Sequence, residues 1–389
     1  MSVTAAKGFT AAGIAAGIKA PFISGSGGNP DLALVVNNGP RLAAAGVFTS
    51  NRVKAAPVVW SEQVVRGGVV SAVVLNSGGA NACTGPLGFQ DTHATAERTA
   101  EATGGSASEV AVASTGLIGI RLPMDKLLPG IDRAATELSP YGGEKAAIAI
   151  KTTDSVHKTA VAEGAGWTVG GMAKGAGMLA PGLATMLVVL TTDADLDAAT
   201  LDKALRAATR TTFDRADSDG CMSTNDTVLL LASGASEVTP AYDDFAAAVE
   251  KVCADLARQL IGDAEGASKD IRIEVVNAAS EDDAVEVGRS IARNNLLKCA
   301  LHGEDPNWGR VLSAIGTTAA AFEPDRLNVA INGVWVCKNG SVGEDRDLVD
   351  MRYREVHITA DLAAGTDTAT IWTNDLTAEY VHENSAYSS

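Results

Sequence analysis

The apolar residues of this chain are grouped in short runs that end in glycine, asparagine or small polar residues. The runs that have the length of a strand and are rich in valine, leucine and alanine are residues 32–36, 69–75, 110–113, 186–190 and 228–232. A short apolar run bounded by turn residues predicts a strand that is buried on both faces. We therefore expect the first two thirds of the chain to contain buried strands joined by tight turns.

Amphipathic helices are predicted between and after these strands. Over residues 242–261, apolar side chains recur at intervals of three and four positions, and a glycine follows. That spacing places them on one face of a helix. Further helices are expected at 92–102, 198–213 and 280–298. Ser280, with Asp283 three residues later, predicts an N-terminal cap for the last of these helices.

The last third of the chain returns to strand patterns. Residues 271–275 alternate between apolar and polar, as in a half-buried strand. Another strand is expected over 327–336, and a hairpin is expected from residues 356–362 and 369–372. Strands and helices follow one another without a regular βαβ rhythm. The pattern therefore favours an α+β fold with antiparallel or mixed sheets over a doubly wound parallel sheet.

Composition narrows the class of protein. With 389 residues, 46% hydrophobic and 20% charged, the chain is long enough for two lobes of a folded soluble protein. The net charge of −16 argues against a nucleic-acid or membrane surface as partner. No apolar run is long enough to cross a bilayer. The cysteines are scattered and form no C-x-x-C pair, which predicts reduced thiols and a cytoplasmic location.

Two common kinds of catalytic site have little support in the sequence. The histidines are isolated and none has the spacing of a zinc ligand, so we expect no metal. No G-x-S-x-G segment is present, so a hydrolase triad built on a nucleophile elbow is the weaker hypothesis. No cofactor is expected either, because the glycine-rich loops have neither a Walker lysine nor a G-x-G-x-x-G pattern.

Thr185 is a candidate nucleophile, because it stands where a glycine-containing loop meets the apolar run 186–190. By position alone, an ordinary strand threonine is the commoner interpretation. The alternative is that its hydroxyl attacks the carbonyl of Ala184 and an N-to-O acyl shift gives an ester that water cleaves. The new N-terminal threonine then carries both a nucleophile and an amine base with a reference pKa of about 7.7–8.0. The pattern of residues leaves both interpretations open.

A second candidate feature is the turn that follows the strand 110–113. Thr115 and Gly116 stand there among small residues, and backbone N–H groups in such a turn can hold a developing oxyanion. A plain strand-to-helix turn is the commoner interpretation of this segment taken by itself.

The segment KGAGMLAPGLATMLVVLTTDA, residues 174–194, closely resembles the cleavage segment of the ornithine acetyltransferase family, the glutamate N-acetyltransferases of arginine biosynthesis. Further segments resemble blocks of this family, occur in the family's order and cover nearly the whole chain. They are SGGANACTG (77–85), ASTGLIG (113–119), KTTD (151–154), GGMAKGAGM (170–178), DGCMSTNDT (219–227), EGASKD (265–270) and GEDPNWGR (303–310).

The resemblance implies a self-cleaving acyltransferase. Cleavage between Ala184 and Thr185 gives an α chain, 1–184, and a β chain, 185–389. Thr185 takes acetyl from N2-acetyl-L-ornithine, ornithine leaves, and L-glutamate accepts the acetyl group to give N-acetyl-L-glutamate. Thr115 and Gly116 match the family's oxyanion-hole pair. The positions that match substrate contacts are Thr152, Lys174, Thr185, Glu265, Asn384 and Ser389, with Thr153 as the alternative to Thr152.

The resemblance also implies the architecture and the assembly. It predicts a layered αββα core of the N-terminal-nucleophile kind over 1–272, a smaller α/β lobe over 273–365 and a tail, 366–389, that returns to the active site. The fragments are expected to assemble as α2β2. Some members of the family also use acetyl-CoA as a substrate. The alternative functions are a related N-terminal-nucleophile aminopeptidase or amidase, in which water is the acceptor, and a non-catalytic binding protein that keeps its chain intact.

Overall fold

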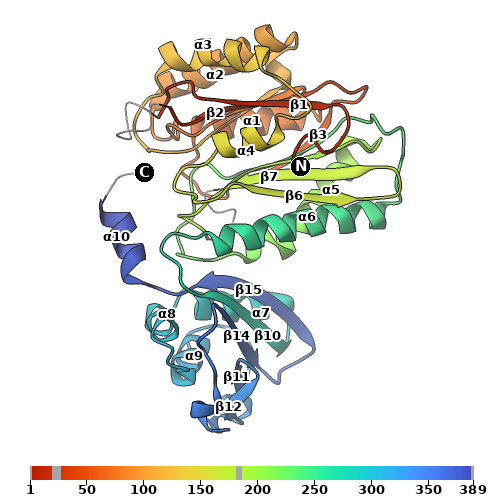
Figure 1. The fold of residues 1–389 in the computed structure, drawn as a ribbon. Coiled ribbons are helices and arrows are strands. Elements are labelled where there is room, and N and C mark those ends of the chain that lie inside the picture. Colours follow the sequence, from red (N-terminus) through yellow and green to blue (C-terminus); the bar gives the residue numbers. More distant parts are fainter. Residues whose placement is uncertain (1, 20–27, 181–185, 387–389) are drawn as a thin grey trace.

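A computed structural model of the chain describes residues 2–19, 28–180 and 186–386, and in this part of the chain the strands form three sheets (Figure 1). The first sheet has the order β1-β2-β4-β5 and the second the order β3-β9-β8-β7-β6. The strands of the first sheet are β1 (Phe9–Ile14), β2 (Leu32–Asn37), β4 (Ala72–Asn76) and β5 (Val110–Ser114). Those of the second are β3 (Ala43–Phe48), β6 (Lys158–Glu163), β7 (Thr168–Lys174), β8 (Leu187–Thr192) and β9 (Thr227–Ala232).

These two sheets stack face to face and carry helices on their outer faces (Figure 1). The helices α2 and α3 cover the first sheet, and α5 and α6 cover the second. The helices of this part are α1 (Ala56–Arg66), α2 (Gly85–Thr103), α3 (Met124–Thr136), α4 (Gly143–Ala149), α5 (Ala198–Thr211) and α6 (Tyr242–Gly262). The predicted αββα layering is therefore confirmed.

The central strand β8 shows why residues 187–190 form an unbroken apolar run. Leu187 and Val189 point into the core between the two sheets, whereas Val188 and Leu190 point into the layer formed with α5 and α6. Successive side chains of a strand point to opposite faces, so a strand buried on both faces favours a run of apolar residues. The strand is parallel to β9 and antiparallel to β7. It is therefore held on both edges and both faces.

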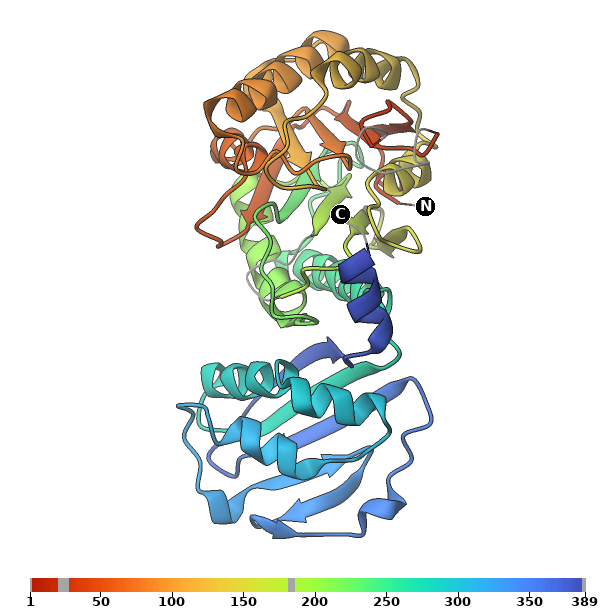
Figure 2. The same cartoon turned by 90° about the vertical axis from the view of Figure 1, so that its left-hand side faces the viewer.

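The smaller lobe is built on the third sheet, which has the order β13-β12-β11-β14-β10-β15 and carries helices on one face (Figure 2). Its strands are β10 (Asp270–Ala278), β11 (Asn328–Ile331), β12 (Val334–Lys338), β13 (Ser341–Val342), β14 (Glu355–Asp361) and β15 (Asp367–Asn374). Its helices are α7 (Glu281–Ala292), α8 (Asn295–His302) and α9 (Trp308–Ile315). Short 3₁₀ turns occur at Ala107–Glu109, Phe213–Arg215, Pro324–Arg326 and Arg346–Leu348.

The predicted hairpin of residues 356–362 and 369–372 is wrong. The two strands, β14 and β15, do not pair with each other, because β10 lies between them. It runs parallel to β14 and antiparallel to β15. Local spacing suggested a hairpin, but the alternating apolar residues of β10 contribute to the same buried face as those of both neighbours.

The predicted helix 280–298 is two helices. Ser280 caps α7 by accepting a hydrogen bond from the Asp283 backbone N–H at 3.1 Å, as predicted. The helix ends at Ala292, and Asn294 starts α8 by accepting a hydrogen bond from the Leu297 N–H at 3.0 Å. Asparagine is a favoured N-cap because its side chain satisfies a free backbone donor. The chain therefore turns here instead of continuing one helix.

The third sheet begins at Asp270 and ends at Asn374, so it extends beyond the boundaries expected at residues 272 and 365. The remaining segment contains α10 (Ala378–Ala386), which lies beside the core in both views (Figures 1 and 2). Thr377 fastens the start of this segment, because its hydroxyl donates to the Gly266 carbonyl at 2.6 Å. None of the helices in the described ranges is long and apolar enough to cross a membrane.

Candidate active site

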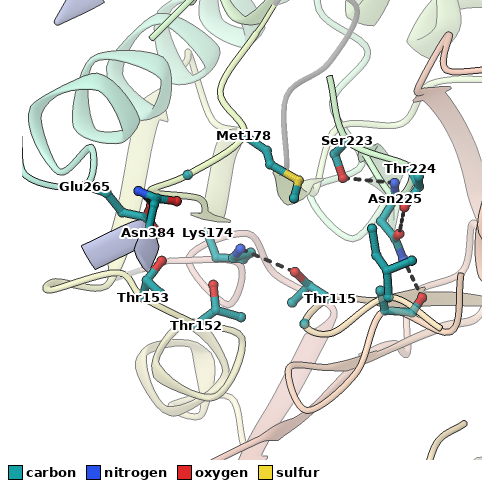
Figure 3. A pocket seen from close by; sticks show the side chains of 14 residues that line it. Thr115, Thr152, Thr153, Lys174, Met178, Ser223, Thr224, Asn225, Glu265 and Asn384 are labelled. Atoms are coloured by element: carbon teal, nitrogen blue, oxygen red, sulfur yellow. Dashed lines mark hydrogen bonds between the residues drawn. The ribbon is translucent and has the colours of Figure 1, made fainter. Parts of the chain in front are cut away.

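One pocket brings together the residues expected from distant parts of the sequence (Figure 3). The predicted residues that line it are Thr115, Gly116, Thr152, Lys174, Glu265 and Asn384. Thr153 lines it as well, so both threonines considered for substrate contact face the same space. Ala184, Thr185 and Ser389, the other predicted positions, lie outside the described residues.

The Thr115–Gly116 turn is held by the loop that follows β4. The Thr115 N–H donates to the Asn76 carbonyl at 3.0 Å, and Thr115 forms an isolated β-bridge with Gly79. Gly116 has a φ of 125°, a region that L side chains rarely adopt, and a Cβ atom there would lie 2.8 Å from the Gly79 nitrogen. Only glycine fits this close approach of two backbones.

Lys174 ends β7 and is almost completely buried, with 2% of its surface exposed. Its ammonium group donates to the Thr115 hydroxyl at 3.4 Å (Figure 3). Burial lowers the pKa of Lys174 below its usual value, while the charges of Asp154 and Glu265 act to raise it. The site therefore places a desolvated cation beside the turn that contains Gly116.

Asp154 organises the loop that carries Thr152. One oxygen, Oδ1, accepts from the Gly175 N–H at 2.6 Å and from the Lys158 ammonium at 2.7 Å. The other, Oδ2, accepts from the Thr152 N–H at 3.0 Å. Burial alone would raise the pKa of Asp154, but the charges of Lys174 and Lys158 outweigh it and hold this pKa well below its usual value. The sequence placed Asp154 in a family-like block but did not single it out.

Glu265 lies on the other side of the pocket. Its backbone N–H donates to the Ala176 carbonyl at 2.9 Å, and its Oε2 accepts from the Asn384 side-chain amide at 2.9 Å. A Cβ atom on Gly177 would lie 2.6 Å from that Oε2 atom. The carboxylate therefore occupies space that only a glycine at position 177 leaves open.

Ser223, Thr224 and Asn225 line the pocket but were not predicted as site residues. Asn225 joins two segments next to the Thr115–Gly116 turn, since its side-chain amide donates to the Ser114 carbonyl at 2.8 Å and to the Ala80 carbonyl at 2.6 Å. Its own Oδ1 accepts from the Thr224 hydroxyl at 2.6 Å. The only signal in the sequence was that these residues belong to the block DGCMSTNDT.

Asp226 is fully buried at the start of the central strands. Its Oδ1 atom accepts from the Met186 N–H at 3.0 Å, and its Oδ2 atom has no hydrogen-bond partner among the described residues. Burial raises the pKa of Asp226 well above its usual value. Met186 is the residue that follows Thr185 in the chain, so Asp226 fixes the first described position after the candidate nucleophile.

A buried cation, a carboxylate and a turn of backbone N–H groups in one pocket suit acyl transfer on an amino-acid substrate. Residues 10–389 match the ArgJ family, and the chain belongs to this family. The family predicted from the sequence is thereby confirmed, and the chain is one of the bifunctional acetyltransferases of arginine biosynthesis.

Two relatives are similar over their full length. The arginine biosynthesis bifunctional protein ArgJ of Streptomyces avermitilis is 83% identical over 389 residues, which is 100% of each chain. The protein of the same name from Thermobifida fusca is 64% identical over 388 residues, again 100% of each chain. Among solved structures, the ornithine acetyltransferase of Mycobacterium tuberculosis in complex with ornithine is 58% identical. It covers 48% of this chain and 96% of its own, with a TM-score of 0.44.

Proposed function

We propose that the protein transfers acetyl from N2-acetyl-L-ornithine to L-glutamate, giving L-ornithine and N-acetyl-L-glutamate. The observation that carries this proposal is the pocket that places Lys174 beside the Thr115–Gly116 turn and Glu265 on its other side. A cation and an acid in one pocket complement the carboxylate and the amine of an amino acid. The relative from Mycobacterium tuberculosis, whose structure contains ornithine, supports this class of substrate.

The proposal includes self-cleavage. The Thr185 hydroxyl attacks the Ala184 carbonyl, the peptide bond becomes an ester, and water releases the α chain, 1–184, from the β chain, 185–389. The hydrogen bond from Met186 to Asp226, at 3.0 Å, supports this assignment, because it anchors the chain directly after the bond that is cut. A nucleophile attached to a strand held on both edges is delivered with little conformational freedom.

Acetyl transfer then follows a ping-pong course. The Thr185 hydroxyl gives its proton to its own α-amino group and attacks the acetyl carbonyl of N-acetylornithine. The oxyanion is held by the Thr115 hydroxyl and the Gly116 N–H. Collapse expels the ornithine amine, which takes the proton, and leaves an acetyl ester on Thr185. The amine of glutamate attacks this ester in the second half of the reaction and restores the free hydroxyl.

Lys174 supports the oxyanion hole in this scheme. Its ammonium donates to the Thr115 hydroxyl oxygen at 3.4 Å, so the hydroxyl hydrogen is left to point at the oxyanion. A donor polarised by a neighbouring cation is stronger than an isolated hydroxyl. The same ammonium has further N–H donors for the substrate carboxylate.

The remaining substrate contacts are assigned by the chemistry of their side chains. Glu265 takes an ammonium group, while Thr152 and Asn384 supply neutral hydrogen bonds. Thr153 is the alternative to Thr152. Ser389, from the tail, completes the proposed set.

The proposal extends to a second donor and to the assembly. The relatives are bifunctional proteins, which supports acetyl-CoA as an alternative donor for the acetylation of glutamate. We place the enzyme in the cytoplasm, because the five cysteines are free thiols, and we expect the fragments to form α2β2.

Intact-mass spectrometry and an acceptor assay test the proposal. We expect two fragments that meet at Ala184/Thr185 and transfer of acetyl from N-acetylornithine to glutamate with little free acetate. A single stable chain would contradict the mechanism. Rapid release of acetate with no N-acetylglutamate would instead favour an aminopeptidase or amidase.

A further inference from the structure

Asp154, Lys158 and Asp263 form a buried ionic cluster beside the pocket, which we call the ionic clamp. The Lys158 ammonium lies 2.7 Å from Asp154 Oδ1 and 2.5 Å from Asp263 Oδ2. The side chains of Asp154 and Lys158 are 0% exposed, and that of Asp263 is 9% exposed. Removing three charges from water costs free energy, which their mutual attraction offsets only when the geometry is favourable. The clamp is therefore weak evidence for stability, and its contacts point to a role in positioning.

The clamp ties together three segments that line the pocket. Asp154 accepts from the N–H of Gly175, the residue after Lys174, at 2.6 Å, and from the Thr152 N–H at 3.0 Å. Asp263 accepts from the Ser155 N–H at 3.1 Å and stands two residues before Glu265. One ion network therefore spans the segments that carry the cation, the acid and the threonine of the pocket.

The charges around Lys174 decide whether its buried amine keeps a proton. The acids that act on it are Asp154, Glu265 and Asp226, and the cations are Lys158 and Lys19. Of these charges, Asp154 has the largest effect, and it acts to raise the pKa of Lys174, whereas Lys158 acts to lower it. A neutral amine at this position would be a poor partner for a substrate carboxylate.

We propose that the ionic clamp positions the substrate-binding groups and that its Asp154 carboxylate keeps Lys174 charged. Asp154 provides the neighbouring negative charge, and Lys158 with Asp263 holds Asp154 in place. Through these contacts the clamp sets the separation between Lys174 and Glu265, and so the substrate class, a molecule with a carboxylate and an amine at a fixed spacing. This inference rests on the proposed function of Lys174 as the carboxylate-binding residue.

The test is the pH dependence of KM for N-acetylornithine, with glutamate as acceptor, in variants of the processed enzyme. Asp154→Asn removes the charge that stabilises protonated Lys174, so we expect KM to start rising at a pH about one unit lower than in the parent enzyme. At a fixed alkaline pH, the KM of the variant should therefore be about tenfold higher than that of the parent enzyme. Lys158→Met loosens the hold on Asp154, so we expect a higher KM at every pH. It also removes a charge that opposes protonation of Lys174, so the alkaline rise should start at a higher pH than in the parent enzyme. Titration of the substrate is the same in every variant and cancels in the comparison.

The opposite signs separate charge control from general damage, because loss of packing raises KM in both variants in the same direction at all pH values. Asp91→Asn is the matched control. Like Asp154, Asp91 is a buried acid in an ion pair: its side chain is 7% exposed and lies 2.6 Å from Arg121. It is not among the charged groups that act on Lys174. It should leave the pH profile of KM unchanged. Shifts of the same sign in Asp154→Asn and Lys158→Met, or no shift in either, overturn the inference.

Lys174→Arg keeps the test decisive if a clamp variant fails to fold. A guanidinium stays protonated throughout the accessible range, so the part of the alkaline rise in KM that comes from Lys174 should disappear and only the part due to substrate titration should remain. A rise at the same pH as in the parent enzyme overturns the inference. Absence of acetyl transfer in the parent enzyme would instead contradict the proposed function, so the two failures are distinguishable.

Discussion

The ammonium of Lys174 donates to the hydroxyl of Thr115 at 3.4 Å, which links the end of β7 to the turn after β5. The two residues come from different sheets of the αββα core, and 59 positions separate them in the chain. The contact joins the group proposed to bind the substrate carboxylate to the group proposed to hold the oxyanion. In the proposed mechanism, substrate binding and transition-state stabilisation therefore share one hydrogen bond.

Thr115→Ala removes one oxyanion donor and should lower kcat by about 10²–10³-fold, with a much smaller effect on KM. Steady-state kinetics with N-acetylornithine and glutamate measure both parameters. Thr115→Ser keeps a hydroxyl and serves as the control, with most of kcat retained. A loss in Thr115→Ala that falls on KM alone would assign this hydroxyl to substrate binding instead.

Thr185→Ala should remain a single uncut chain without transferase activity, because both the attacking hydroxyl and the acetyl acceptor are lost. Intact mass and the acetyl-transfer assay measure the two effects. Thr185→Ser retains a hydroxyl and should be cut, although more slowly. Cleavage of the alanine variant at the same bond would show that another residue is the nucleophile.

Gly177→Ala should displace the carboxylate of Glu265, since the added Cβ would lie 2.6 Å from its Oε2 atom. We expect KM for N-acetylornithine to rise by about tenfold, because about one hydrogen bond to a charged group is lost. Self-cleavage should be unchanged. Gly309→Ala, in α9, is the control, because its Cβ would meet its nearest neighbour at 3.7 Å. An unchanged KM in Gly177→Ala would argue against Glu265 as a substrate ligand.

Asp226→Asn should change the pH dependence of stability. The pKa of Asp226 in the folded protein is raised well above 3.8, so the folded state binds a proton that the unfolded state releases. Stability therefore falls as pH rises from the unfolded pKa to the folded one, by up to about 1.4 kcal/mol per pH unit from this group. The Asp226→Asn variant should not show this loss of stability with rising pH, because asparagine does not titrate.

Denaturant unfolding at pH 5 and pH 8 measures the difference, and both proteins should carry Thr185→Ala so that neither is cut. We expect the free energy of unfolding of Asp226→Asn, relative to that of its parent, to increase from pH 5 to pH 8. Asn can still accept from the Met186 N–H, which preserves the local geometry. A relative stability that stays constant with pH would mean that Asp226 is ionised in the fold.

Local sequence patterns were sufficient to predict elements that are buried on both faces or along one continuous face. The run 186–190 predicted β8, Leu187–Thr192, because a strand covered on both faces buries consecutive side chains. The spacing of residues 242–261 predicted α6, which is Tyr242–Gly262. The order of β14, β10 and β15 escaped prediction, because it depends on pairing between segments that local spacing does not connect.

The candidate site shows the same division. By itself, the sequence determined the family and predicted Thr185, Thr115, Lys174 and Glu265 as site residues, because blocks of residues in a fixed order carry that information. Only the tertiary structure decided that Asn225 and Asp154 belong to the site. Asn225 donates a hydrogen bond to Ser114, which lies 111 positions away in the chain, and Asp154 accepts one from Gly175, which lies 21 positions away. A buried polar residue is defined by its hydrogen-bond partners, and folding alone brings those partners within reach.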